Sequence, residues 1–259
     1  MAKIHPTAIV HPGAELGNDV EIGPFSIINE NVIIGDGCKI KSHVVIDSGT
    51  RLGKNVAVFS GAVLGTAPQD LKYNGEKTYL EVGDNTIIRE FATLNRGTAH
   101  SFRTIVGQNC LLMAYVHVAH DCIIGNDVII ANAVNMGGHV VIGDFAGIGG
   151  ITGIHQFVHI GQHAFVGGGY RITKDVPPFI LAMGEPLQYG GLNTIGLKKH
   201  GFSSDAMLMI KRAYKIVYRS GLTKKAALDK LQQDFENSPE VRVIAWFLAQ
   251  SDRGIIKGV

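Results

Sequence analysis

Histidines suited to acid–base chemistry recur in the middle of this sequence, and they are His117, His120, His139 and His155. A neutral imidazole can take a proton from a hydroxyl group near neutral pH. Asp121 directly follows His120 and can orient it or balance its charge. The backbone N–H groups of Gly137–Gly138, just before His139, can hold a developing oxyanion. We therefore expect general-base catalysis here.

Two other interpretations of these histidines stay open. Histidines from neighbouring subunits can bind zinc, and histidines at surface corners can lack any role. Covalent catalysis is not favoured, because no Ser/His/Asp or Cys/His arrangement is evident. Direct attack of an acceptor hydroxyl on an activated acyl group is the simpler hypothesis.

A six-residue period runs through two thirds of the chain and must position these side chains. Stepping by six from Ile4 to Ile172 gives 29 positions, and 26 of them are large and apolar. The three exceptions are Asp70, Glu76 and His100. Small or β-branched residues stand four positions after the large ones. Such a short, sustained repeat is typical of a solenoid.

The period predicts a triangular prism, in which each hexad makes one short strand and one corner. Three hexads close an 18-residue coil, and coils stack at about 4.8 Å with their apolar side chains inside. A step of 18 from His120 reaches Gly138 and then Gln156. His139 and His155 stand one residue from that line, so we expect the histidines to meet across successive coils.

Two polar excursions interrupt the repeat, at 66–80 and at 99–104. Loops on a rigid scaffold often carry binding groups, although a tolerated surface insertion is the alternative. In the first excursion Asp70 and Lys72 lie close together in the run QDLKY, which favours a functional role. For the second, the composition does not decide.

The period fades after Ile172, and we divide the chain into a β-helix over 1–185 and a helical C-terminal domain over 186–259. Ser203 or Ser204, Thr223 and Ser238–Pro239 are suited to begin three helices. Lysines and arginines make this region basic. It is either a solvated helix surface or a docking site for an acidic carrier protein or for phosphates.

The overall composition points to a cytoplasmic protein that binds no nucleic acid. A formal net charge of +2 gives no dense basic stripe. No run of 18 apolar residues predicts a membrane span, and the first ten residues do not form a signal peptide. Cys38, Cys110 and Cys122 occupy inward positions without metal-type spacing, so we expect inert core residues. We predict no metal and no cofactor.

The segments QDLKY, HVAHDC, GGHV, IHQF and YRSG…SDRG resemble the UDP-N-acetylglucosamine 3-O-acyltransferase family of lipid A biosynthesis, over essentially the whole chain. The resemblance implies a left-handed parallel β-helix and a homotrimer with sites in clefts between subunits. It implies transfer of a 3-hydroxyacyl chain from acyl carrier protein to the 3-position of a UDP-amino sugar.

The resemblance also implies a role for individual residues. His120 is the general base, Asp121 its acidic partner, and Gly138 supplies the oxyanion N–H. The substrate-binding positions are Asp70, Lys72, His117, His139, His155, Gln156, Gly168, Asn193 and Lys199. Among these, Asn193 matches a nucleotide contact, and a residue as small as Gly168 implies a long acyl groove.

The sequence departs from the family pattern at a few positions. Asn95 stands where the family often has His, and Ile195 and Lys199 stand near the nucleotide pocket where acidic and arginine residues are common. Lysine does not reproduce the bidentate phosphate contact of arginine. The acceptor is therefore UDP-N-acetylglucosamine or its 3-amino analogue. A γ-type metal-dependent lyase and a non-catalytic scaffold are the alternatives of another class.

Overall fold

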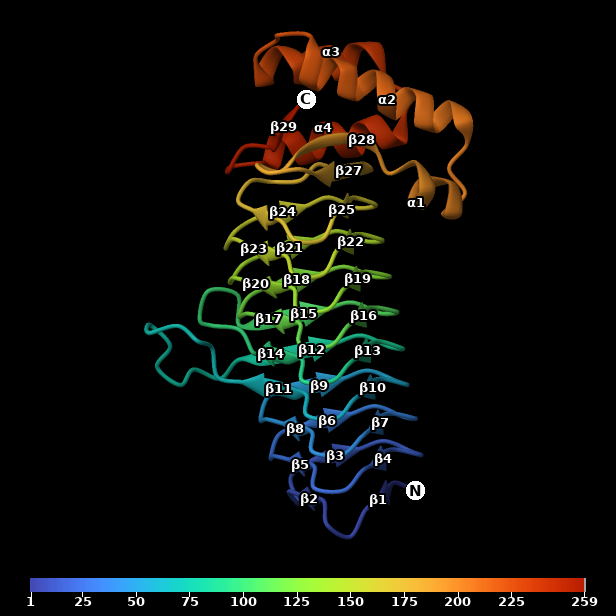
Figure 1. Ribbon diagram of the computed structural model, residues 1–259. Helices are drawn as coiled ribbons and strands as arrows, with labels where there is room; N and C mark the ends of the chain where they lie inside the picture. The colour runs from blue at the N-terminus through green and yellow to red at the C-terminus, as the bar shows by residue number, and fades with distance from the viewer. Residues whose placement is uncertain (259) are drawn as a thin grey trace.

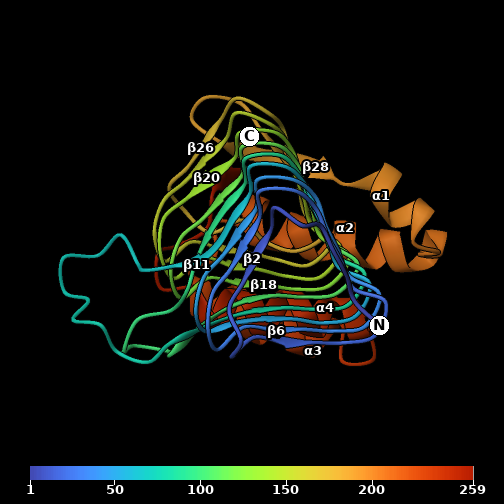
Figure 2. The same cartoon turned by 90° about the horizontal axis from the view of Figure 1, so that it is seen from below.

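The computed structural model describes residues 1–258 and forms a left-handed parallel β-helix with helices stacked on its C-terminal end (Figure 1). Viewed from below, the coils make a triangle with three flat sides (Figure 2). Each side is a sheet in which successive coils pair parallel, and we call the sheets A, B and C in the order in which the chain first visits them. The predicted fold class is thus confirmed.

The strands of the three sheets are mostly two residues long. Sheet A contains β1 (Lys3–Ile4), β4 (Glu21–Ile22), β7 (Lys39–Ile40), β10 (Ala57–Val58), β13 (Ile87–Ile88), β16 (Leu111–Leu112), β19 (Ile129–Ile130), β22 (Gly147–Ile148), β25 (Phe165–Val166), β27 (Ile180–Met183), β28 (Gln188–Leu192) and β29 (Lys257–Gly258). Sheet B contains β2 (Ile9–Val10), β5 (Ile27–Ile28), β8 (Val45–Ile46), β11 (Val63–Thr66), β14 (Thr93–Asn95), β17 (His117–Val118), β20 (Asn135–Met136), β23 (Gly153–Ile154) and β26 (Arg171–Ile172). Sheet C contains β3 (Glu15–Leu16), β6 (Ile33–Ile34), β9 (Thr50–Leu52), β12 (Tyr79–Val82), β15 (Arg103–Val106), β18 (Ile123–Ile124), β21 (Val141–Ile142) and β24 (His159–Ile160).

The six-residue period fixes which side chains fill the prism. The large apolar residue that ends each short strand is buried from the second coil onward, as Ile22, Ile28 and Ile34 show. The smaller residue four positions later, such as Cys38 or Val44, is also fully buried. One coil exposes its apolar face until the next coil covers it, so stability comes from stacking.

Both polar excursions leave the prism at the same corner. The first joins β11 of sheet B to β12 of sheet C, and the second joins β14 of sheet B to β15 of sheet C. We call this the B–C corner. Strand partners are 18 residues apart in an ordinary coil, as for Lys3 and Glu21, but 30 apart for Ala57 and Ile87 across the first excursion. The excursions add multiples of six, which is why the period survives them.

The C-terminal region confirms the three expected helix starts and adds elements that the sequence did not predict. The helices are α1 (Thr194–Lys199), α2 (Ser204–Arg219), α3 (Lys224–Asp234) and α4 (Pro239–Gln250). Side chains of Ser203, Thr223 and Ser238 cap α2, α3 and α4. Where the six-residue period fades, β27 pairs with β28 antiparallel, which the sequence did not predict.

Sheet A therefore continues past residue 185, and the division into 1–185 and 186–259 remains a prediction. Ser251, after α4, donates a hydrogen bond from Oγ to Asp175 Oδ2 at 2.6 Å, which ties the helices to the last coils. None of the helices in residues 1–258 has the length and apolar character that crossing a bilayer requires.

Candidate active site

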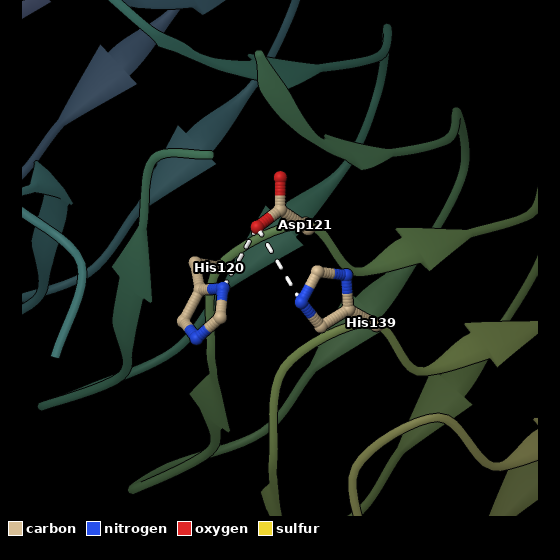
Figure 3. A group of neighbouring side chains, drawn as sticks. All are labelled: His120, Asp121 and His139. Carbon is tan, nitrogen blue, oxygen red and sulfur yellow. Dashed lines mark hydrogen bonds and ion pairs between the residues drawn. The ribbon is translucent and has the colours of Figure 1, made fainter. Parts of the chain in front are cut away.

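Successive coils bring His120, Asp121 and His139 together at the B–C corner. His120 and Asp121 follow β17, and His139 follows β20 one coil higher. The His139 N–H donates to the His120 carbonyl oxygen at 3.1 Å, as expected for stacked corners. Asp121 and His139 both have left-handed backbone angles, with φ of 59° and 62°. Figure 3 shows that the side chains of His120 and His139 both lie next to the Asp121 carboxylate.

Asp121 holds His120 through a direct hydrogen bond. The distance from His120 Nδ1 to Asp121 Oδ2 is 2.8 Å, and the Asp121 side chain is fully buried. Since an ionised carboxylate only accepts, this contact assigns the proton to Nδ1 and leaves Nε2 as the basic nitrogen of neutral His120. No protein group within residues 1–258 hydrogen-bonds to Nε2.

The second excursion keeps the Asp121 carboxylate ionised. Thr98 donates from its N–H at 3.1 Å and from Oγ1 at 2.7 Å, and Ser101 donates from its N–H and its hydroxyl. Burial acts to raise the pKa of Asp121, but the hydrogen bonds from Ser101, Thr98 and His120 outweigh it and lower that pKa to about 2. Asp121 is thus a permanent anion beside His120 at neutral pH.

His139 lies on the other side of the same carboxylate (Figure 3). Its Nε2 is 3.9 Å from Asp121 Oδ2, and its ring stacks on that of Phe157 with the ring centres 4.4 Å apart. The ring of His100, from the second excursion, packs against the His139 ring in a T-shaped arrangement with the ring centres 4.6 Å apart. Burial lowers the pKa of His139 despite the nearby anion, so His139 is neutral at pH 7 and can donate or accept a hydrogen bond.

Gly138 forms the wall opposite the His120 ring. A Cβ at this position would lie 2.5 Å from His120 Cε1 and 2.8 Å from Nε2, so only glycine leaves the imidazole its place. No acceptor within the described chain receives the Gly138 N–H. A free backbone donor therefore lies next to the basic nitrogen of His120.

The other predicted pocket residues lie around this group without joining its hydrogen bonds. His117 is on β17, and its Nδ1 is 2.7 Å from Thr93 Oγ1. Burial and the charge of His120 lower the pKa of His117. His155 and Gln156 are exposed on the next coil, where His155 Nδ1 lies 3.0 Å from the Gln156 carbonyl oxygen. The expected line of three histidines thus brings His120 and His139 into contact, whereas His155 faces solvent.

The same cluster is the candidate metal site. One ligand atom from each of His120, Asp121 and His139 lies within 4.8 Å of the others. Two histidines and a carboxylate can hold zinc with an open position. A metal bound to His120 Nδ1 would replace its hydrogen bond to Asp121, so a metal at that nitrogen and the hydrogen-bonded pair exclude each other.

The cysteines offer no nucleophile. Cys38, Cys110 and Cys122 are buried, and burial raises the pKa of each thiol, to about 12 for Cys122. A thiol that stays protonated at neutral pH is inert.

Comparisons with known proteins decide the family. Residues 175–256 match the family model described as UDP-N-acetylglucosamine O-acyltransferase, domain 2, and residues 13–48 and 103–138 match that of bacterial transferase hexapeptide repeats. The acyl-[acyl-carrier-protein]–UDP-N-acetylglucosamine O-acyltransferase of Chlorobaculum parvum is 54% identical over 98% of this chain and 97% of its own. Its counterpart from Thiobacillus denitrificans is 48% identical over 99% and 100%. The chain belongs to the UDP-N-acetylglucosamine O-acyltransferase family.

Solved structures of this family have the same fold along the whole chain. The enzyme of Acinetobacter baumannii superposes with a TM-score of 0.96 at 43% identity and covers 98% of this chain and 99% of its own. That of Bacteroides fragilis gives 0.95 at 47% identity, covering 98% and 100%. The resemblance and the acyltransferase class predicted from the sequence are thus confirmed.

The remaining positions implied by the family lie on other segments than the histidines, although the charge of Asp70 still acts on His139. Asp70 and Lys72 lie on the first excursion, where Asp70 Oδ1 accepts from the Lys72 N–H at 2.9 Å. Gly168 follows β25 at the corner between sheets A and B. Asn193 caps α1 by accepting from the Gly196 N–H at 3.1 Å, and exposed Lys199 ends that helix. These positions thus lie at three separate places on one chain, namely the first excursion, the corner between sheets A and B, and α1.

Sequence reasoning missed the groups that hold Asp121. Thr98 and Ser101 lie in the second excursion, which runs over residues 96–102 between β14 and β15 rather than over 99–104. Thr104 is in β15 and accepts the Asp121 N–H at 2.9 Å. A usable signal was present, because the second excursion and the His120 turn both join sheet B to sheet C.

Proposed function

We propose that this chain transfers a 3-hydroxyacyl group from acyl carrier protein to the 3-hydroxyl of UDP-N-acetylglucosamine, the first step of lipid A biosynthesis. The observation that carries the proposal is the pairing of His120 with a buried, ionised Asp121 beside the free N–H of Gly138. Family membership supplies the substrates, since the relatives are named for this reaction.

The proposed chemistry is direct acyl transfer. His120 Nε2 takes the proton of the sugar 3-hydroxyl as its oxygen attacks the thioester carbonyl carbon. The carbonyl oxygen becomes an oxyanion that accepts a hydrogen bond from the Gly138 N–H. The C–S bond then breaks, and the proton on His120 passes to the departing carrier thiolate. Asp121 holds Nδ1–H throughout and stabilises the transient imidazolium.

The neighbouring positions supply substrate contacts in this proposal. His117, His139, His155 and Gln156 bind the sugar and the acyl chain around the B–C corner, and Asp70 and Lys72 bind the sugar from the first excursion. Asn193 and Lys199 bind the nucleotide, while Gly168 leaves room for a long acyl chain. These groups occupy different corners of one prism, so a homotrimer that apposes corners of neighbouring subunits accounts for their use in one cleft.

The proposed carrier surface is basic. Lys211, Arg212, Lys215 and Arg219 line a groove between α2 and β28, floored by Tyr189 and Tyr218. A positive surface attracts an acidic partner and raises its association rate. We place the reaction in the cytoplasm. The proposed steps require no metal and no cofactor.

The 3-amino analogue of the sugar is the second candidate acceptor, and Asn95 is the observation behind it. This residue stands where the family often has His, and it is buried beside the base of the first excursion. An amine at the 3-position would yield an amide through the same steps.

An acyl-transfer assay tests the proposal. Purified protein receives 3-hydroxyacyl carrier proteins of several lengths with either UDP-N-acetylglucosamine or its 3-amino analogue. Loss of a general base lowers kcat by about 10²- to 10⁴-fold in His120→Ala. His5→Ala, an exposed histidine of the first coil, is the matched control. Absence of transfer to both sugars by folded protein refutes the proposal, and stoichiometric zinc in that protein would favour the lyase instead.

A further inference from the structure

The short segment Asn95–Thr98 connects the first excursion with Asp121. Its last residue, Thr98, donates twice to the Asp121 carboxylate. Its first two residues, Asn95 and Arg96, contact the first excursion instead. Gly97 lies between them, where a Cβ would come within 2.3 Å of the Arg103 nitrogen, so the segment turns tightly against β15.

Asn95 and Gly97 hold the two ends of the first excursion. Asn95 is buried, and its Nδ2 donates to Thr66 Oγ1 at 3.0 Å and to the Ala67 carbonyl oxygen at 3.1 Å. The Gly97 N–H donates to the Tyr79 carbonyl oxygen at 3.1 Å, where the excursion returns to the prism. The ends are therefore fixed independently of its middle.

Arg96 reaches the middle of the excursion. Its Nε donates to the Tyr73 hydroxyl at 3.2 Å, and its guanidinium lies 5.7 Å from the centre of the Tyr73 ring. Nη1 donates to the carbonyl oxygens of Ser48 at 3.0 Å and Gly65 at 3.3 Å. The guanidinium is thus anchored in the prism while its Nε faces the excursion.

No other hydrogen bond in residues 1–258 connects residues 68–77 with the rest of the protein. The remaining ones stay inside the excursion, such as Tyr73 Oη to the Glu76 carbonyl oxygen at 2.9 Å and the Lys72 N–H to Asp70 Oδ1. The excursion projects far from the prism (Figure 1), and its Leu71 is fully exposed. Without the Arg96–Tyr73 contact, residues 68–77 would have no hydrogen bond to the rest of the described chain.

We propose that Arg96 is a positioning residue that fixes the first excursion through Tyr73 and thereby sets affinity for the UDP-sugar. The inference rests on the proposed function, because Asp70 and Lys72 are its expected sugar contacts. Arg96 itself touches neither reacting atoms nor His120. Its loss should therefore weaken sugar binding and leave the chemical step nearly intact.

Limited trypsin digestion tests the anchoring without any substrate. Lys72 and Lys77 are exposed in the excursion, and cleavage there follows the population of the released form. Arg96→Ala removes a charged hydrogen-bond donor, so cleavage after these lysines should be about tenfold faster. Tyr73→Phe keeps the ring, removes the same hydrogen bond together with the one to the Glu76 carbonyl oxygen, and should give at least a similar increase. Arg103→Ala is the control, since Arg103 is exposed and pairs with Glu81 on the neighbouring strand.

Steady-state kinetics then connect the anchoring to the sugar. KM for the UDP-sugar should rise about tenfold in Arg96→Ala and in Tyr73→Phe, with kcat changed by less than about threefold. The double variant should lose clearly less than the sum of the two single losses, because the Arg96–Tyr73 hydrogen bond is removed in both single variants. Unchanged cleavage and KM in the two variants, or fully additive losses in the double variant, overturn the inference. A wild-type protein without transfer activity refutes the proposed function instead, while the trypsin comparison still decides the anchoring.

Discussion

Replacing Asp121 by asparagine should separate the charge of this residue from its shape. Oδ1 accepts from Thr98 and Ser101, and Oδ2 accepts from Thr98 Oγ1 and His120 Nδ1. An asparagine amide has one accepting oxygen, so in either orientation its NH₂ group faces donors. The variant therefore keeps the volume of the side chain but opposes the hydrogen bonds that hold it.

The expected losses follow from these contacts. A hydrogen bond to a charged group contributes about 1.5–3 kcal/mol, so losing the bond to protonated His120 should lower kcat by about 10- to 150-fold. The folded-state pKa of Asp121 lies below its usual value of 3.8, at about 2. A lowered carboxyl pKa stabilises the fold above the unfolded-state pKa, by roughly 2 kcal/mol here, and this contribution is lost as pH falls from about 4 to 2.

Two measurements check these values, namely kcat at pH 7.5 and the urea midpoint of unfolding between pH 6 and pH 2. The wild-type midpoint should fall more steeply below pH 4 than that of Asp121→Asn. Asp84→Asn is the matched control, because Asp84 Oδ1 accepts the Lys54 N–H at the corner between sheets C and A, and Asn126 already fills the equivalent position in a later coil. That variant should keep full activity.

The reasoning would be refuted by an Asp121→Asn enzyme that is stable and within about twofold of wild-type kcat, because a lost charged hydrogen bond is larger than that. If Asp121→Asn unfolds at neutral pH, Ser101→Ala tests the catalytic role of Asp121 instead. This substitution removes one donor to Asp121 and should raise its pKa toward the ordinary value. Activity should then fall at a higher pH on the acid side than in the wild type.

Two further outcomes are expected. Gly168→Met should shorten the preferred acyl chain in competition assays with mixtures of acyl carrier proteins of different chain length. A Cβ at this position would lie 3.0 Å from the Gly150 carbonyl oxygen, so the longer side chain must extend outward. Unchanged chain preference would contradict the role of Gly168. Burial, followed by the charge of His200, lowers the pKa of His163 to about 4, so its neutral form stabilises the fold above pH 6.5 and about 3 kcal/mol is lost as pH falls to 4. His163→Gln should flatten the urea midpoint over that range, and a slope equal to that of the wild type would argue against this origin.

The sequence predicted the prism well because every coil obeys the same rule. Apolar residues at every sixth position must face inward, and excursions of 12 and 6 extra residues preserve that register. The same arithmetic placed Gly138 against His120, since stacked corners are fixed by hydrogen bonds between coils. Local periodicity therefore sufficed wherever a contact joins equivalent positions of neighbouring coils.

The six-residue period by itself did not predict contacts made from outside the repeat. Thr98 and Ser101 reach Asp121 from an excursion whose path no repeat determines. The antiparallel pairing of β27 with β28 was also missed, because these strands follow the point where the six-residue period fades. Asn193 was expected from the family to contact a nucleotide, whereas its hydrogen bonds in the structure also reveal a helix cap.

At the B–C corner, the rigid coils carry the groups for the chemical step, and the projecting excursion carries groups expected to bind the sugar. His120 and Gly138 belong to stacked coils, so the distance between base and oxyanion donor is set by strand spacing and resists change. Asp70 and Lys72 belong to a projecting excursion, whose middle depends on Arg96 alone among the hydrogen bonds of the described chain. Substitutions in the excursion should therefore change substrate affinity, whereas substitutions in the coils should change the rate of the chemical step. The Asn95–Thr98 segment touches both, which makes it the place where affinity and rate can be altered together.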